Sequence, residues 1–253
     1  ALARRRGGPV GRGCGGGVDR GARVVDGGVR DGALRDAGVP TPRSIRVAGR
    51  ADALSRPEQL PFPFPVFVKP ANGGSSVGVT KVKRFEDLDP AISLALRYDE
   101  SALVEEAIDA RELECAVLGD REPRASIVGE VVPGHEFYDY DDKYREDKAR
   151  LLIPAPISES VSTEVRRLAV EVFRLCGISG MARVDFFLER GSDRVLVNEL
   201  NTLPGFTAIS MYPKLWEASG IPLPALLDEL IRLAIARKEK RARLSYKPPA
   251  ELA

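Results

Sequence analysis

Two acidic residues and an asparagine stand at alternate positions in two apolar runs that a turn joins. Asp185 lies in the first run, Glu199 and Asn201 lie in the second, and the turn is centred near Ser192. Because side chains alternate along a strand, a hairpin with this turn places Asp185 opposite Glu199 and Arg183 opposite Asn201, all on one face. The pattern therefore predicts two opposed carboxylates.

Like charges directly opposite one another destabilise a sheet, so the pattern favours a cation bound between them. Asp185, Glu199 and Asn201 offer only hard oxygen ligands, which favours Mg²⁺ or Mn²⁺ over zinc. Three protein ligands leave room for water and for nucleotide phosphates. The alternative is a surface hairpin whose acids point to solvent. The interleaved apolar residues, among them Val184 and Phe186, demand burial and favour the metal site.

A second candidate site begins at Lys69, at the end of an apolar strand-like run. It is followed by the sequence Gly-Gly-Ser-Ser-Val-Gly at 73–78. Glycines let backbone N–H groups approach an anion, and lysine adds a mobile positive charge, so the segment is suited to holding phosphate. The alternative is a purely structural turn, because Gly-Ser loops are common and this one lacks the spacing of a P-loop.

Length and composition favour a soluble protein of more than one domain. The 253 residues carry a formal net charge of +1, and this balance gives no reason to expect nucleic-acid binding. Cys14, Cys115 and Cys176 show no metal spacing and predict a reducing compartment without disulfides. No apolar stretch is long enough to span a membrane and the basic start lacks a secretory pattern, so we expect a cytoplasmic protein without membrane insertion.

Residues 1–30 differ from the rest of the chain in composition. They hold ten of the 24 glycines, seven arginines and no hydrophobic periodicity, so we expect disorder. Gly- and Arg-rich segments also occur as RNA-binding tails, but no aromatic residue is interleaved here to stack on bases. Our hypothesis is that this stretch is a truncated or out-of-frame reading of a GC-rich gene. An uninterrupted, in-frame gene start at residue 1 would contradict it.

From Leu34 onward the chain shows regular strand and helix signals. A first helix ends at Gly38, and a second begins near Phe85. Ser162 is the expected cap of a helix that ends at Gly177, and a basic amphipathic helix covers 224–244. Hydrophobic alternation predicts strands at 44–48, around Lys69, and at 77–82, 102–109, 112–120 and 126–133.

Polar residues stand out in two further places. Glu106 and Glu114 lie in predicted strands and are interpreted as charges at sheet edges. Residues 134–150 form a long polar loop that carries four aromatic side chains. Loops of this length in compact domains are usually functional, so we predict a lid over a site. His135 lies in the same loop and is the only histidine, which excludes a zinc site or a triad built on histidines.

Together, these motifs resemble the ATP-grasp superfamily and, closely, the D-alanine–D-alanine ligase family. The matching segments run in the family's order over roughly residues 31–236: LRDAGVPTP, FVKPANGGSSVGV, VEEAIDARELECAV, EFYDYDDKY, LLIPAP, ARVDFFL and NELNTLPGFTAISMYP. The resemblance implies an α+β ATP-grasp fold with two subdomains that grip ATP. We expect these subdomains at 31–105 and 106–240, between the Gly/Arg-rich start at 1–30 and a tail at 241–253.

Carried over position by position, the resemblance also implies a role for individual residues. The implied nucleotide-binding residues are Lys69, Ser76, Glu105, the backbone of Glu106 and Ile108, Glu112 and Lys143. The implied metal ligands are Asp185, Glu199 and Asn201, holding two Mg²⁺ or Mn²⁺ ions. The implied catalytic groups are Arg183, Tyr144, Ser75 and the backbone of Gly205, and the second substrate's carboxylate pocket is Ser210 with Met211.

The reaction that the resemblance implies joins two D-alanines at the expense of ATP, for synthesis of the peptidoglycan precursor. The first D-alanine is phosphorylated to an acyl phosphate, which the amine of the second attacks. The tyrosine at position 144 favours an amine nucleophile over D-lactate. Alternatives are a D-alanine–D-serine ligase, another ATP-grasp carboxylate–amine ligase, or a nucleotide-binding module without catalysis.

Two departures from the family pattern shape our expectations. The family's amino-terminal domain has no counterpart here, and the position expected to be basic after Asp26 is Gly27. We therefore expect weak ATP binding and little turnover from this chain as given. Full-length members of the family form homodimers, and the surface they use belongs to the domain that is missing here.

Overall fold

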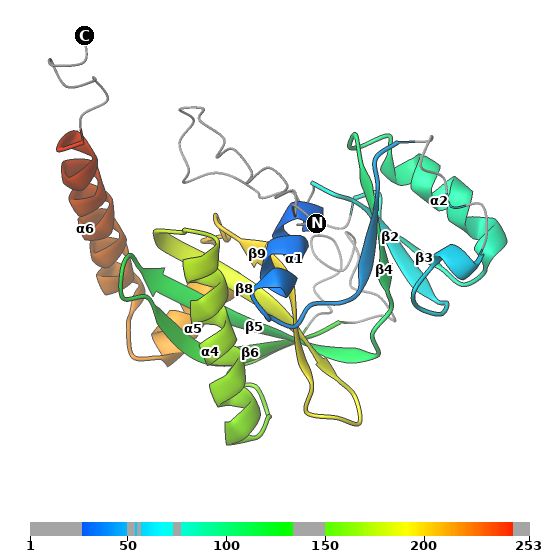
Figure 1. The fold of residues 1–253 in the computed structure, drawn as a ribbon. Helices are drawn as coiled ribbons and strands as arrows, with labels where there is room; N and C mark the ends of the chain where they lie inside the picture. Colours follow the sequence, from blue (N-terminus) through cyan, green and yellow to red (C-terminus); the bar gives the residue numbers. More distant parts are fainter. Residues whose placement is uncertain (1–26, 50–53, 55–56, 73–76, 134–149, 245–253) are drawn as a thin grey trace, which may run out of the picture.

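The computed structural model describes residues 27–49, 54, 57–72, 77–133 and 150–244. Two antiparallel sheets lie side by side, and each has its own helical cover (Figure 1). The expected α+β architecture is confirmed. The three residues 107–109 link the last strand of the first sheet to the first strand of the second.

The first sheet has four strands in the order β1-β4-β2-β3. Its strands are β1 (Ser44–Val47), β2 (Val66–Pro70), β3 (Thr80–Val82) and β4 (Ala102–Glu106). Two short helices, η2 (Pro57–Gln59) and η3 (Phe85–Asp87), accompany α2 (Leu88–Ala95). Val66, Val68 and Val104 point inward at alternate positions and pack on the buried side of α2. Lys69 falls between buried positions of β2 and therefore projects from the other face.

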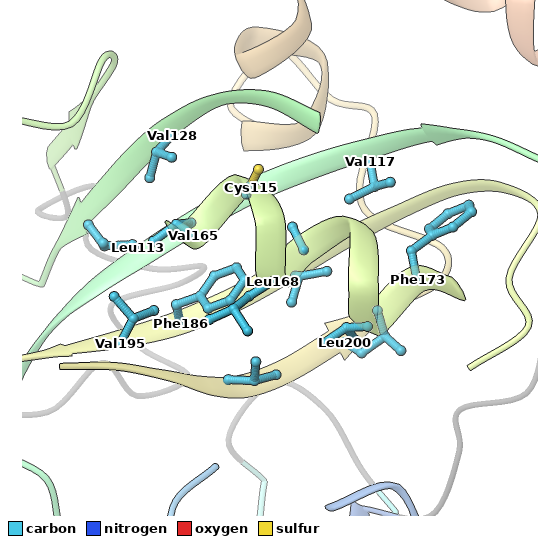
Figure 2. Packing of buried hydrophobic residues seen from close by; sticks show 14 of the residues in the cluster. Leu113, Cys115, Val117, Val128, Val165, Leu168, Phe173, Phe186, Val195 and Leu200 are labelled. Atoms are coloured by element: carbon cyan, nitrogen blue, oxygen red, sulfur yellow. The ribbon is translucent and has the colours of Figure 1, made fainter. Parts of the chain in front are cut away.

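The second sheet has five strands in the order β7-β6-β5-β8-β9. Its strands are β5 (Ala110–Gly119), β6 (Arg124–Val132), β7 (Arg150–Leu152), β8 (Gly180–Glu189) and β9 (Val195–Asn201). The helix α4 (Glu159–Leu175) packs its apolar stripe on one face, where Val165, Leu168 and Phe173 belong to one buried cluster with Phe186 of β8 (Figure 2). On the other face α5 (Met211–Ala218) and α6 (Leu223–Ala242) cover one part of the sheet.

The segment that begins at α1 (Gly27–Asp36) belongs to the core of the second sheet. Leu34 and Val39 are buried among residues of α4, β8 and β9, and the Pro40 carbonyl accepts a hydrogen bond of 2.8 Å from the Val197 N–H. The expected first subdomain, 31–105, therefore includes residues whose apolar side chains pack in the second. Sequence order alone cannot reveal this, because the contacts join segments that are distant along the chain.

The helix α4 begins earlier than the sequence pattern suggests. Ser158, not Ser162, is its cap: Ser158 Oγ accepts a hydrogen bond from the Val161 N–H at 3.3 Å, and Ser162 already lies in the first turns. Both serines suit a helix start, and the extended backbone of Ser158 decides between them. At the other end, Gly177 has a φ of 63°, a left-handed conformation that glycine adopts readily, which confirms the expected stop.

Within the described residues, no helix combines the length and the apolar character that crossing a membrane would require.

Candidate functional site

The hairpin of β8 and β9 has the register that the sequence predicted. Asp185 lies opposite Glu199, and Arg183 lies opposite Asn201. The register shifts directly after Asp185, where β9 contributes one extra residue. Val184 and its neighbours on the other face are buried beneath α4, so the polar side chains project from the face opposite to that helix.

Arg183 supplies the positive charge beside these acids. Its Nε and Nη2 each lie 2.7 Å from an oxygen of Asp185, a bidentate pair, and Asn201 Nδ2 donates to Asp185 Oδ2 at 3.3 Å. Burial disfavours the charged guanidinium, but the attraction of Asp185 and Glu114 outweighs it and raises the pKa of Arg183. The opposed acids therefore do not by themselves require a metal ion.

Glu114 is the residue that sequence reasoning missed. It was interpreted as an edge charge, which is wrong, because β5 is the central strand of the sheet and Glu114 is only 8% exposed. Glu114 lies directly opposite Asp185, and its Oε2 is 3.0 Å from Arg183 Nε. Burial, followed by repulsion from Asp185, raises the pKa of Glu114 to about 8. Three acids, Glu114, Asp185 and Glu199, thus lie side by side across three strands.

The donor set of the hairpin fits a hard divalent cation. Asp185 and Glu199 contribute carboxylates, and Asn201 contributes an amide whose oxygen is a ligand for Mg²⁺ or Mn²⁺. In the described part of the chain, no group of three or more His, Cys, Asp or Glu side chains is arranged so that it could hold a metal ion. An ion bound by Asp185 would have to take oxygens that Arg183 now contacts.

On the first sheet, two expected nucleotide-binding residues meet as an ion pair. Lys69 Nζ lies 2.6 Å from Glu105 Oε2, with side chains that are 23% and 7% exposed. They come from the adjacent strands β2 and β4, and Glu105 lies opposite Phe67, two positions before Lys69. The structure therefore brings the expected phosphate-binding lysine against the expected adenine-side acid.

Three other expected nucleotide residues lie near the link between the sheets. Glu106 ends β4, and its carboxylate accepts hydrogen bonds from the backbone N–H and the Nε of Arg43, at 2.8 and 2.7 Å. The Glu106 N–H itself donates to the Arg43 carbonyl. Ile108 is half-buried within the link, and Glu112 is half-buried on β5, two residues before Glu114 and on the same face. The edge-charge interpretation fails for Glu106 too, because β4 lies inside the first sheet.

The expected pocket for the second substrate lies where β9 leads into α5. Ser210 Oγ accepts a hydrogen bond from the Thr207 N–H at 3.0 Å, and a Cβ on Gly205 would come within 2.7 Å of this oxygen. Gly205 therefore permits a close approach of the loop to the helix start. Met211, the first residue of α5, is 4% exposed and lies in the same core cluster as Tyr212, so its side chain belongs to the core and does not line a pocket. Only its backbone can serve a substrate.

Four expected site residues, Ser75, Ser76, Lys143 and Tyr144, lie outside the described residues. The predicted lid at 134–150 falls there too, except for Arg150, which begins β7.

Two linked antiparallel sheets, one with a Lys–Glu ion pair and the other with an acidic hairpin, are the arrangement of the ATP-grasp class. Among solved structures, the D-alanine–D-alanine ligase of Coxiella burnetii superposes with a TM-score of 0.76 at 39% identity, over 86% of this chain and 58% of that one. The VanG D-Ala:D-Ser ligase of Enterococcus faecalis gives a TM-score of 0.74 at 34% identity, over 82% and 61%.

The chain belongs to the D-alanine–D-alanine ligase family, because residues 34–232 match the model for the D-ala D-ala ligase C-terminus. The curated D-alanine–D-alanine ligase of Solibacter usitatus is 55% identical over 180 residues, which are 71% of this chain and 55% of the relative. That of Thermoanaerobacter pseudethanolicus is 49% identical over 215 residues, 83% of this chain and 60% of the relative. The chain thus spans little more than half the length of these relatives.

Proposed function

We propose that the chain is the nucleotide- and metal-binding part of an ATP-dependent ligase that joins two D-alanines into a dipeptide for peptidoglycan synthesis. The observation that carries this proposal is the cluster of Arg183 and Asp185 with Glu199 and Asn201, on the hairpin of a chain that belongs to this family. The substrates are small molecules, and the reaction takes place in the cytoplasm.

The chemistry follows from the charges of the reactants. A carboxylate is a poor electrophile, so transfer of the γ-phosphoryl group of ATP to the first D-alanine gives an acyl phosphate and releases ADP. The amine of the second D-alanine then attacks the acyl carbon, and inorganic phosphate leaves. Arg183 would stabilise the oxyanion of the tetrahedral intermediate, together with the backbone N–H of Gly205.

Asp185, Glu199 and Asn201 would hold Mg²⁺ or Mn²⁺, and the family pattern provides for two ions. When bound, these ions neutralise charge on the transferring phosphate. Lys69 would leave Glu105 partly or wholly to contact the nucleotide phosphates, while Glu105 and the backbone of Glu106 and Ile108 would hold adenine and Glu112 would bind the ribose hydroxyls. Ser75, Ser76 and Lys143 would contact the phosphates, and Tyr144 would close over the substrates.

The second substrate is D-alanine in this proposal, held through its carboxylate by Ser210 and the Met211 N–H. D-serine is the second candidate, because the fold also superposes on a ligase described as acting on D-alanine and D-serine. Competition between the two amino acids in dipeptide formation would decide between them.

The proposal is tested by binding first and turnover second. Calorimetry should show that the chain binds Mg²⁺-ATP and that Asp185→Asn weakens this binding by about tenfold or more, because a ligand carboxylate is lost. Release of ADP, which we expect to be slow from this chain, should rise with D-alanine and vanish in Asp185→Asn. Equal binding by both proteins would refute the metal assignment. Binding without D-alanine-dependent ADP release would support a nucleotide-binding module instead.

A further inference from the structure

Arg183 is shared by two carboxylates from different strands, the half-buried Asp185 and the buried Glu114. Asp185, two residues along β8, receives both Nε and Nη2 at 2.7 Å. Glu114, on the neighbouring strand β5, places Oε2 at 3.0 Å from the same Nε. The Glu114 oxygen is buried and accepts no geometrically sound hydrogen bond from any described residue. The guanidinium of Arg183 therefore forms a bidentate pair with Asp185 and only a single, less well aligned contact with Glu114.

The proposed function makes two demands on Asp185. As a metal ligand it must turn its oxygens to a divalent cation, yet these are the oxygens that now hold Arg183. A cation and a guanidinium repel one another, so both cannot occupy the same carboxylate edge. Arg183, with a side chain only 20% exposed, then needs another counter-charge, because an unpaired charge in a buried place is costly.

We propose that Glu114 is the positioning residue for Arg183: when a divalent cation takes Asp185, Glu114 becomes the carboxylate that keeps the guanidinium in the site. This inference rests on the proposed function. Glu114 is already opposite Asp185 in the sheet, so the guanidinium changes partner with a small rotation about its own side chain. Without Glu114, Arg183 competes with the cation for Asp185, and once the cation has bound there the guanidinium leaves the site.

The chain contains a matched control in Glu130. It is 6% exposed, compared with 8% for Glu114, and lies on the neighbouring strand β6 of the same sheet. It too is paired with an arginine, since Arg111 donates Nε and Nη2 at 2.8 and 2.7 Å. This pair belongs to the α4 face, away from the hairpin acids, because Glu130 lies opposite Leu113 of that core. Glu130→Gln therefore removes a buried charge without touching the site.

The experiment follows the Nε–H signal of Arg183 by ¹⁵N NMR, with Arg183→Lys used to assign it. The signal is recorded in chelator and with saturating Mg²⁺-ADP, which lacks the γ-phosphate that could itself hold the guanidinium. In the wild-type protein and in Glu130→Gln the slowly exchanging Nε–H should persist in both states. In Glu114→Gln it should persist in chelator, where Asp185 holds it, and be lost with Mg²⁺-ADP.

Affinity supplies the second readout. Glu114→Gln should weaken Mg²⁺-ADP binding about tenfold, the lower end of the range for side chains that orient metal ligands, and Glu130→Gln should not change it. In an Arg183→Gln background, Glu114→Gln should have much less effect, since Glu114 acts through the arginine.

Persistence of the signal in Glu114→Gln with Mg²⁺-ADP would overturn the inference, and so would an undiminished effect of Glu114→Gln in the Arg183→Gln background. Failure of the proposed function is seen separately. If wild-type protein and Asp185→Asn bind Mg²⁺-ADP equally, Asp185 is not a metal ligand, and both the proposal and this inference fall.

Discussion

The two arginine–glutamate pairs of the second sheet differ in how their charges balance. On the α4 face, Arg111 and Glu130 form a closed bidentate pair, with a further hydrogen bond from Arg111 to the Pro156 carbonyl. On the hairpin face, Arg183 is shared by Asp185 and Glu114. The difference teaches that the proposed site in this sheet is marked by more acidic side chains than arginines, and not by a buried ion pair as such.

The two pairs also differ in the charges around the arginine. Hydrogen bonding and attraction from Glu130 raise the pKa of Arg111, and each oxygen of Glu130 accepts a hydrogen bond from this arginine. Glu114 and Asp185 lie opposite one another on adjacent strands, so they repel each other when both are ionised, and they share one guanidinium. A cation from outside would relieve that repulsion.

Removing the shared arginine should have the largest effect. Arg183→Met leaves the buried Glu114 and the half-buried Asp185 without their shared arginine, and we expect a loss of about 3–5 kcal/mol in the free energy of unfolding, measured with urea in chelator. Arg111→Met leaves only one acid, Glu130, without its arginine, so the loss of free energy of unfolding should be smaller. Millimolar Mg²⁺ should restore part of the stability of Arg183→Met alone, because ligand binding to the folded state stabilises it. If Arg183→Met and Arg111→Met lost the same free energy of unfolding and neither responded to Mg²⁺, the two faces would not differ in the way described.

The pH dependence of stability should also differ between the faces. Burial and then repulsion from Asp185 raise the pKa of Glu114 from 4.5 to about 8, so the folded protein binds this proton more tightly than the unfolded chain. In chelator, this contribution is complete below about pH 4.5 and is lost as the pH rises to about 8. Urea unfolding across this window should show the decline in wild-type protein and in Glu130→Gln. A decline of the same size in Glu114→Gln would contradict the assignment.

The ion pair of the first sheet should show a smaller and more selective effect. Lys69→Met removes the partner of Glu105, and we expect Mg²⁺-ATP affinity to fall about tenfold, the effect of losing one charged hydrogen bond to phosphate. Lys69→Arg keeps the charge and should retain most of the affinity. Stability should fall by about 1–3 kcal/mol, because Glu105 is left buried and unpaired. Unchanged calorimetric affinity in Lys69→Met would place the nucleotide phosphates elsewhere.

Much of the fold was predictable because its signals are local. The alternation of apolar and polar residues predicted the strands β1, β2, β4, β5 and β6. The helical spacing of apolar residues predicted α4 and α6. The helix α5 was not predicted: its eight residues, Met211–Ala218, are too few to show a clear period. Its packing explains Gly129, where a Cβ would lie 2.6 Å from Met211 Cε. That contact joins two distant segments, and no local pattern in the sequence indicates it.

The sequence by itself determined the face and the pairing of Asp185 with Glu199 and of Arg183 with Asn201, because a short turn between two alternating runs leaves one sensible register. Only the tertiary structure decided that Glu114 joins them. Glu114 comes from a strand far away in the sequence, and the pairing of β5 with β8 depends on burying both strands between α4 and the helices of the opposite face. The charge surplus that marks the site arises from that long-range pairing, since no single stretch of sequence contains all of its members.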